Sequence, residues 1–179
     1  MTSSSPQSST LEARLQEIED RLEIYNLIAS HPPSADIGAD YYSRAVYLED
    51  GVMDLDGGRG AKGNEAIAAI VKTPAHQAAI AGGLAHFASL PHVTIDGDSA
   101  VATSYLQILT PQKDAEPVEL SGHGVSRGFR IHRVGANRWE LVRTEAGWRI
   151  KRRTLRPLDG SEPAHVLLRQ ALASFGTGV

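Results

Sequence analysis

Apolar residues near the start of the chain recur at alternating spacings of four and three, which predicts an amphipathic helix with one apolar stripe. The stripe consists of Leu11, Leu15, Ile18, Leu22, Tyr25 and Ala29. Ser9 followed by Glu12 fits a capping box at the start of this helix. Pro32 and Pro33 are expected to end it, because proline lacks the backbone N–H and pushes the preceding residue out of the α region.

The next segment shows shorter helical patterns around one strand. A second helix is expected over residues 39–48, and the sequence GVMDLDGG that follows predicts a short strand closed by glycines. A third helix is expected in KGNEAIAAIVK, capped by Asn64, and a weaker helical stretch in PAHQAAIAGG.

From Leu84 onward the apolar period changes to two, which predicts strands. The segment LAHFASLPHVTI, the turn DGDS and the return strand AVATSYLQIL form a predicted hairpin. On the return strand, Tyr105 and Gln107 share the face that we expect to line a pocket. One long strand is expected over residues 118–134, with RWELVR continuing it, then the strand WRIKRRTL and a C-terminal helix that ends at Gly176.

Helices followed by a run of antiparallel strands predict an α+β domain. Helices packed on one face of a curved antiparallel sheet would make a cone-shaped α+β barrel around an apolar ligand cavity. Residues 1–9 are expected to form a disordered tail, and residues 10–179 a single domain.

Composition narrows the function classes. The chain has no cysteine, which excludes disulfides, thiolate metal sites and cysteine nucleophiles and is compatible with a cytoplasmic location. A net charge of -3 offers no field for nucleic acid or an anionic membrane. No apolar run is long enough to span a membrane, and the N-terminus does not match a secretory signal. The histidines lack tight ligand spacing, so we expect no metal site.

The standard local catalytic motifs are missing from the sequence: it has no phosphate loop, dinucleotide fingerprint, HExxH or GxSxG. What remains is a dispersed set of polar residues around His31, Asp36 and His86. The stretch IASHPPSADIG raises the question whether the proline break is an ordinary loop or presents His31 and Asp36 to a pocket.

The order of several segments resembles the SnoaL-like branch of the nuclear transport factor 2-like (NTF2-like) superfamily. They are the long first helix, ADYYSRAVYLEDGVMDL, GNEAIAAIV, HFASLPHVTIDGDSAVATSYLQIL and RWELVRTEAGWRIKRR, so that the resemblance covers roughly residues 11–158. Scytalone dehydratase, bile-acid 7α-dehydratase, hexachlorocyclohexane dehydrochlorinase, ketosteroid isomerase and polyketide cyclases share this fold. Non-catalytic subunits share it too, so the fold alone does not give the function.

The resemblance also implies site residues. In the dehydratase-like members an aspartate after the first helix and a histidine that opens the first long strand form a catalytic dyad, and Asp36 and His86 occupy those positions. His31 stands where relatives often have tyrosine or lysine, and Arg153 matches an arginine that often follows the last tryptophan. The pair Pro32–Pro33 departs from the unbroken helix usual in relatives.

The implied chemistry is elimination of water by general acid–base catalysis. Histidine suits both proton transfers because its unperturbed pKa lies near neutrality, and an aspartate on one ring nitrogen would fix its tautomer. Arg153 or the hydroxyl of Tyr105 would stabilise a developing enolate oxygen. His31, Tyr105, Gln107 and Arg153 are therefore expected to bind substrate.

Structural alternatives stand beside each of these roles. Asp36 would also serve as the N-cap of the second helix, His86 as a core histidine, and Arg153 as part of a solvated basic run. His31 would equally be a loop residue beside the prolines.

The expected function is a cofactor-independent dehydratase that acts on a small hydrophobic hydroxy-ketone, such as a steroid or polyketide. An isomerase or cyclase would use the same dyad, and a non-catalytic ligand-binding or subunit role is the other alternative. As in many relatives, a homodimer or homotrimer is expected, with no nucleic-acid or membrane partner.

Overall fold

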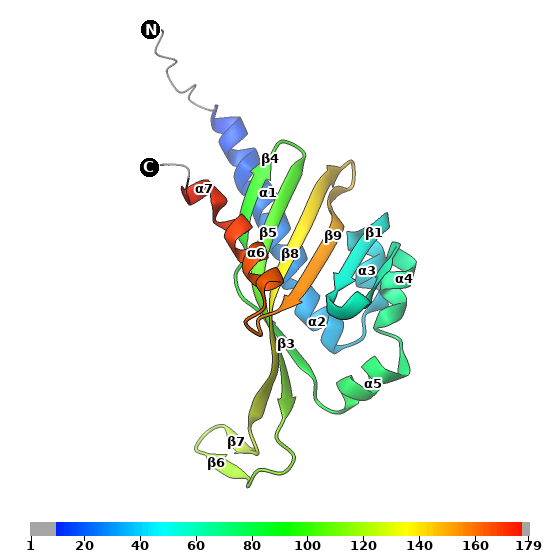
Figure 1. Cartoon of the computed structure of the whole chain (residues 1–179), viewed down its shortest axis with the longest axis vertical. Helices are drawn as coiled ribbons and strands as arrows, with labels where there is room; N and C mark the ends of the chain where they lie inside the picture. Colours follow the sequence, from blue (N-terminus) through cyan, green and yellow to red (C-terminus); the bar gives the residue numbers. More distant parts are fainter. Residues whose placement is uncertain (1–9, 177–179) are drawn as a thin grey trace.

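A curved mixed sheet forms the centre of the protein, and helices pack on both of its faces (Figure 1). The computed structural model describes residues 10–176. The expected tail of residues 1–9 and its Ser9 lie outside the described residues. The sheet order is β2-β1-β9-β8-β5-β3, with β4 also paired to β5. The strands are β1 (Tyr47–Leu55), β2 (Gly60–Lys62), β3 (Ala85–Ala88), β4 (His92–Asp96), β5 (Ser99–Pro111), β8 (Phe129–Thr144) and β9 (Gly147–Pro157).

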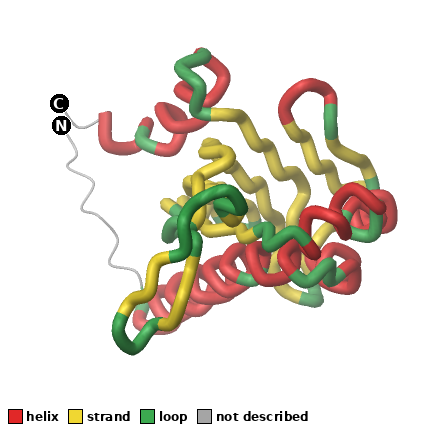
Figure 2. The backbone as a smooth tube through the Cα atoms, turned by 90° about the horizontal axis from the view of Figure 1, so that it is seen from below, coloured by secondary structure: helices red, strands yellow, loops and turns green. Residues whose placement is uncertain are grey.

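The sheet bends around the core without closing, so the α+β class is confirmed but the closed barrel is not (Figure 2). Its pairs are antiparallel except for β1 with β9, and β5 and β8 share the longest ladder. The inner face carries Trp139, Leu141 and Ile150, which form the core with Ile24 and Ile28 of the first helix. This core and the helices above it frame one end of the sheet.

The helices confirm most of the predicted pattern. They are α1 (Leu11–Ala29), α2 (His31–Asp36), α3 (Asp40–Val46), α4 (Asn64–Ile70), α5 (Pro74–Ala81), α6 (Glu162–Ala171) and α7 (Ala173–Gly176), with a 3₁₀ turn η1 at Asp56–Gly58. The predicted C-terminal helix is interrupted at Leu172. Thr10 caps α1 through a hydrogen bond from the backbone N–H of Ala13, and Gly63 rather than Asn64 is the cap position of α4.

The proline pair starts a helix instead of ending one. Helix α1 already ends at Ala29, and Pro32 and Pro33 lie in the first turn of α2. The first backbone N–H groups of a helix have no intrahelical partner, so proline loses nothing there and its fixed φ favours the helix. His31 therefore begins a helix and is buried, and the expectation that the prolines make a loop is wrong.

The buried face of α1 also differs from the predicted stripe. Leu11, Leu15, Ile18 and Leu22 are exposed, whereas Asp20, Ile24 and Ile28 are buried. The apolar periodicity was correct as evidence for a helix but pointed to the wrong face, because a buried aspartate has strong partners on the sheet.

The expected homodimer or homotrimer stays a prediction.

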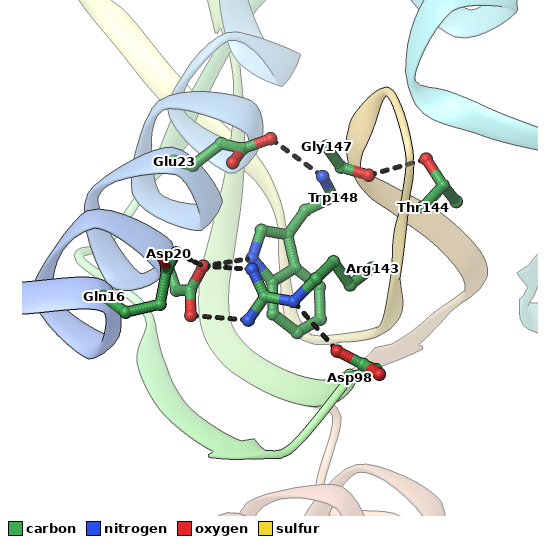
Figure 3. Close-up of polar contacts among 8 residues, drawn as sticks. All are labelled: Gln16, Asp20, Glu23, Asp98, Arg143, Thr144, Gly147 and Trp148. Atoms are coloured by element: carbon green, nitrogen blue, oxygen red, sulfur yellow. Dashed lines mark hydrogen bonds and ion pairs between the residues drawn. The ribbon is translucent and has the colours of Figure 1, made fainter. Parts of the chain in front are cut away.

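Those partners form a polar clamp between α1 and the hairpin of β8 and β9 (Figure 3). Both carboxylate oxygens of Asp20 accept hydrogen bonds from the guanidinium of Arg143, and the indole Nε1 of Trp148 donates to Asp20 at 3.2 Å. The backbone N–H of Trp148 donates to Glu23 at 2.8 Å. Arg143 lowers the pKa of Asp20 to about 2, so the pair holds the helix on the sheet at neutral pH.

The predicted long strand over residues 118–134 is interrupted. Residues Val118–Leu120 (β6) and Gly124–Ser126 (β7) pair with each other as a separate small sheet. With the outer ends of β5 and β8 they make an arm that projects below the main sheet in Figure 1. Glycines at 122, 124 and 128 all have positive φ, which breaks the regular strand geometry.

Replacing Asp20 with Asn should lower the free energy of unfolding by about 2 kcal/mol at neutral pH, since it removes the charge from a partly buried, hydrogen-bonded ion pair. The pKa of Asp20 is lowered on folding, so its stabilisation is present above the unfolded value of 3.8 and is lost as the pH falls toward about 2. Urea denaturation of both proteins across this range should show the difference shrinking. Asp98→Asn is the matched control. This exposed carboxylate contacts the same arginine, and its replacement should change the free energy of unfolding by less than about 1 kcal/mol. Equal effects of the two variants would contradict the clamp.

Candidate active site

The side chain of Asp36 at the end of α2 binds His86 at the start of β3. The ring Nδ1 of His86 lies 2.6 Å from Asp36 Oδ1, and the backbone N–H of His86 donates to Oδ1 at 3.1 Å and to Oδ2 at 3.0 Å. Asp36 is not a helix cap, because the cap position of α3 is Ala39. The sequence prediction that these two residues meet is therefore correct in geometry.

This contact orients the His86 ring. The carboxylate oxygens of Asp36 act as acceptors, so the hydrogen is assigned to Nδ1 and the lone pair to Nε2. Nε2 has no hydrogen-bond partner within residues 10–176, and His86 lines a cavity. Burial lowers the pKa of His86, while Asp36 opposes this shift. A neutral imidazole with a free Nε2 is able to accept a proton at neutral pH.

The cavity has a volume of about 160 Å³ and lies between the helices and the inner face of the sheet. Its walls come from α2, α3, α4, α5 and strands β1, β3, β5, β8 and β9. The lining residues are His31, Ser34, Ala35, Ser43, Met53, Leu55, Ile67, Ile70, Val71, His76, His86, Leu106, Ile108, Arg133, Arg153 and Leu155. Most of the wall is apolar, and the polar groups are concentrated in histidine and arginine.

His31 reaches the cavity, contrary to its reading as a loop residue. Its ring lies edge-on to the Trp139 ring at 5.3 Å between centroids and 6.2 Å from the His86 ring. The residue is 8 % exposed. Burial, reinforced by the charges of Arg153 and the other histidines, lowers the pKa of His31 well below its ordinary value.

Arg153 also lines the cavity and is not part of a solvated basic run. Its side chain is buried, its Nε donates to Asn137 Oδ1 at 3.0 Å, and its guanidinium carbon lies 4.7 Å from the centroid of the Trp139 ring. A register shift at Lys151 explains the difference within the run: Ile150 pairs with Leu141 and Arg152 with Glu140, so Lys151 is the extra, exposed residue and the buried face resumes at Arg153.

Tyr105 and Gln107 are a correction. Both are exposed, and the cavity is lined instead by Leu106 and Ile108 from the same strand. Successive side chains of a strand point to opposite faces, so choosing the wrong face moved every predicted contact of β5. Tyr105 therefore does not line the site.

The sequence prediction missed several polar residues of the site, including His76, Arg133 and Asn137. His76 lines the cavity from α5 and its Nε2 lies 2.9 Å from the carbonyl oxygen of Ala35. Arg133 lines it from β8, and Asn137 holds Arg153. A lone histidine in a weak helical pattern carried no signal, but Asn137 in the middle of a long strand did, because a polar residue there is unfavourable unless it has a partner.

A larger hollow of about 730 Å³ lies at the base of the arm, between α5 and the outer ends of β5 and β8. It contains neither Asp36 nor His86.

Within residues 10–176, no cluster of three or more His, Asp or Glu side chains has the geometry to hold a metal ion. None of the described helices is long and apolar enough to cross a membrane. The smaller cavity is the candidate active site, because it is lined by His86, whose ring Asp36 orients.

Comparison with known proteins gives one family match: residues 16–154 match the SnoaL-like domain. An NTF2-like protein with a cystatin-like fold from Novosphingobium aromaticivorans is 40% identical, with a TM-score of 0.77, over 91% of this chain and 99% of that one. The comparison with curated proteins gives no match.

Two more distant structures share the fold. A candidate scytalone dehydratase from Novosphingobium aromaticivorans is 17% identical with a TM-score of 0.58, over 83% of this chain and 88% of that one. Hexachlorocyclohexane dehydrochlorinase from Novosphingobium barchaimii is 13% identical with a TM-score of 0.60, over 83% of this chain and 97% of that one. At these identities the likeness concerns the fold alone.

The buried histidines should make the protein less stable in mild acid. Their pKa values are lowered on folding, so the unfolded chain takes up protons first and stability falls as the pH drops below 6.5. Each such group contributes at most about 1.4 kcal/mol per pH unit. His31→Leu should reduce this slope, as measured by denaturant unfolding from neutral pH to mild acid. His123→Leu, on the exposed arm, is the matched control, and an unchanged slope in His31→Leu would contradict the assignment.

Proposed function

Because this chain belongs to the SnoaL-like family of the NTF2-like superfamily, we propose that it is a lyase that removes water from a small hydroxy-ketone without a cofactor. The single observation that carries the proposal is the contact of His86 Nδ1 with Asp36 at 2.6 Å beside a largely apolar cavity. This arrangement leaves one imidazole nitrogen free for proton transfer.

The reaction follows from that nitrogen. His86 Nε2 takes a proton from the carbon next to the carbonyl, and the electron pair of the broken C–H bond moves to the carbonyl oxygen to give an enolate. The enolate then re-forms the carbonyl and a carbon–carbon double bond, which expels the β-hydroxyl group. The imidazolium of His86 returns its proton to this leaving group, so the products are water and the unsaturated ketone.

Asp36 and Arg153 support the two charges that develop. Asp36 stabilises the imidazolium, and by binding Nδ1 it fixes the ring so that Nε2, the other nitrogen, stays free for the substrate. Arg153 is buried in the cavity wall, and in this proposal its guanidinium stabilises the enolate oxygen. Burial makes each interaction stronger than it would be in water.

His86→Gln should lower the rate of dehydration by about 10²–10⁴-fold, because it removes the general base while roughly keeping the size of the side chain. Wild type and variant would be incubated, with no cofactor added, with a panel of hydroxylated ketones of increasing size, and products followed by mass spectrometry. Loss of one water with the wild type alone is the expected result. Asp36→Asn should also lower the rate of dehydration. His123→Gln, at an exposed histidine, is the matched control and should keep the wild-type rate.

Other outcomes identify the alternatives. Products of unchanged mass and new retention time would show an isomerase or cyclase that uses the same dyad. Turnover that survives in His86→Gln would refute the role of this histidine. Tight binding with no turnover by any protein would indicate a ligand-binding role.

A further inference from the structure

Arg153 is a buried cation without an acidic partner. The residue is 4 % exposed, its Nε donates to Asn137 Oδ1, and the hydroxyl of Tyr47 lies near its guanidinium. Within the described part of the chain no aspartate or glutamate forms an ion pair with it. An arginine keeps its charge in proteins, and a buried charge that lacks a counter-ion is costly. No carboxylate of the described residues pairs with Nη1 or Nη2, so this edge of the guanidinium is available to an anionic acceptor from outside the chain.

The other charged residue of the cavity wall has the same sign. Arg133 is a second arginine in the lining, and its one ion pair among residues 10–176 is a long 4.0 Å contact with Asp56; no aspartate or glutamate of this part of the chain lines the cavity. The nearby Asp36 is occupied by His86, which donates hydrogen bonds to both of its carboxylate oxygens. A cavity with cationic walls and low-dielectric surroundings favours an anion.

Buried polar atoms around Arg153 also lack partners. Among the described residues they include Asn137 Nδ2, Trp139 Nε1, Ser104 Oγ and Tyr47 Oη. Strand pairing brings three of these residues together, since Trp139 lies opposite Arg153 and Asn137 lies opposite Ser104. The amide nitrogen of Asn137 and the indole nitrogen of Trp139 can only donate, so a hydrogen-bond acceptor would satisfy them, while the two hydroxyls can donate or accept.

The volume limits the size of that acceptor molecule. About 160 Å³ is close to the volume of an apolar protein cavity that holds one benzene ring, and it is below the about 300 Å³ at which pockets for larger ligands begin. A four-ring steroid would not be enclosed here.

Together, the geometry points to a substrate of about one-ring size that carries a carboxylate, bound by the Nη1 and Nη2 edge of Arg153. This inference rests on the proposed function, because the carboxylate and the hydroxy-ketone would belong to the same molecule. A carboxylate accepts two parallel N–H bonds from arginine, and two further N–H groups then remain for the developing enolate oxygen. The substrate class is thus a small hydroxy-keto acid rather than a neutral polycyclic compound.

Benzoate and benzamide are the probes, because they have nearly the same size and differ in charge. Isothermal titration of the full chain should show that benzoate binds at least about 10-fold more tightly than benzamide, as expected for a charge-assisted pair. Arg153→Met should abolish this preference. Arg14→Met, on the exposed part of α1, is the matched control and should bind benzoate as the wild type does.

Arg153→Lys provides a second variant if the methionine variant does not fold. It keeps the charge but not the planar fork, so benzoate should bind more weakly while remaining preferred over benzamide. Equal affinity of the wild type for the two probes, an unchanged preference in Arg153→Met, or no binding of benzoate at all would overturn the inference.

His86→Gln separates this inference from the proposed function, since benzoate binding does not need the base. Benzoate binding that persists in His86→Gln, combined with no dehydration of any hydroxy-keto acid by the wild type, would refute the lyase and keep the anion site. Dehydration of a neutral hydroxy-ketone with no preference for its acidic counterpart would refute the anion site and keep the lyase.

Discussion

The ion pair between Asp20 and Arg143 is the contact on which the placement of the helices depends. It joins the first helix to the hairpin of β8 and β9, which are far apart in sequence, and Trp148 adds a hydrogen bond from the centre of the core. Helix α2 follows α1 after a single residue, so fixing α1 on the sheet also fixes where α2 ends. The carboxylate of Asp36 stands at that end, where it meets His86.

The candidate site uses its charged groups unevenly. The aspartate that the cavity needs is placed behind His86, where it orients the ring and accepts three hydrogen bonds. The arginine side of the cavity has no such compensation and includes several buried donors without acceptors. A structure that stores an unpaired cation in its core loses stability there, and a bound anion would offset the loss. A substrate would therefore bind in one orientation, with its acidic C–H bond toward the base His86 and its anionic group toward Arg153.

Family membership and site geometry determine different properties of the protein. The SnoaL-like match and the 40% identical NTF2-like protein establish the fold and the family. They do not choose a substrate, because the same fold carries dehydratases, isomerases and non-catalytic members. The choice of substrate depends on the residues that face the cavity, on its volume and on its charge.

Local chemistry is what the sequence by itself determined. The period of apolar residues identified α1, β5 and β9, and the turn residues of DGDS identified the hairpin between β4 and β5. Resemblance to the family identified Asp36, His86 and Arg153, which do meet at one cavity or its wall. These features depend on short-range pattern or on motif order, so a single chain carries them.

Only the tertiary structure decided which face of each element is buried. Apolar periodicity placed Leu11, Leu15 and Leu22 inside, yet Asp20 is buried because its partners lie more than a hundred residues away on the sheet. The same limit moved Tyr105 and Gln107 out of the cavity, since a strand presents both faces and its neighbours decide which one is covered. It also decided that Pro32 and Pro33 begin a helix and that His31 is buried, because proline fits the first turn of a helix as well as it fits a break.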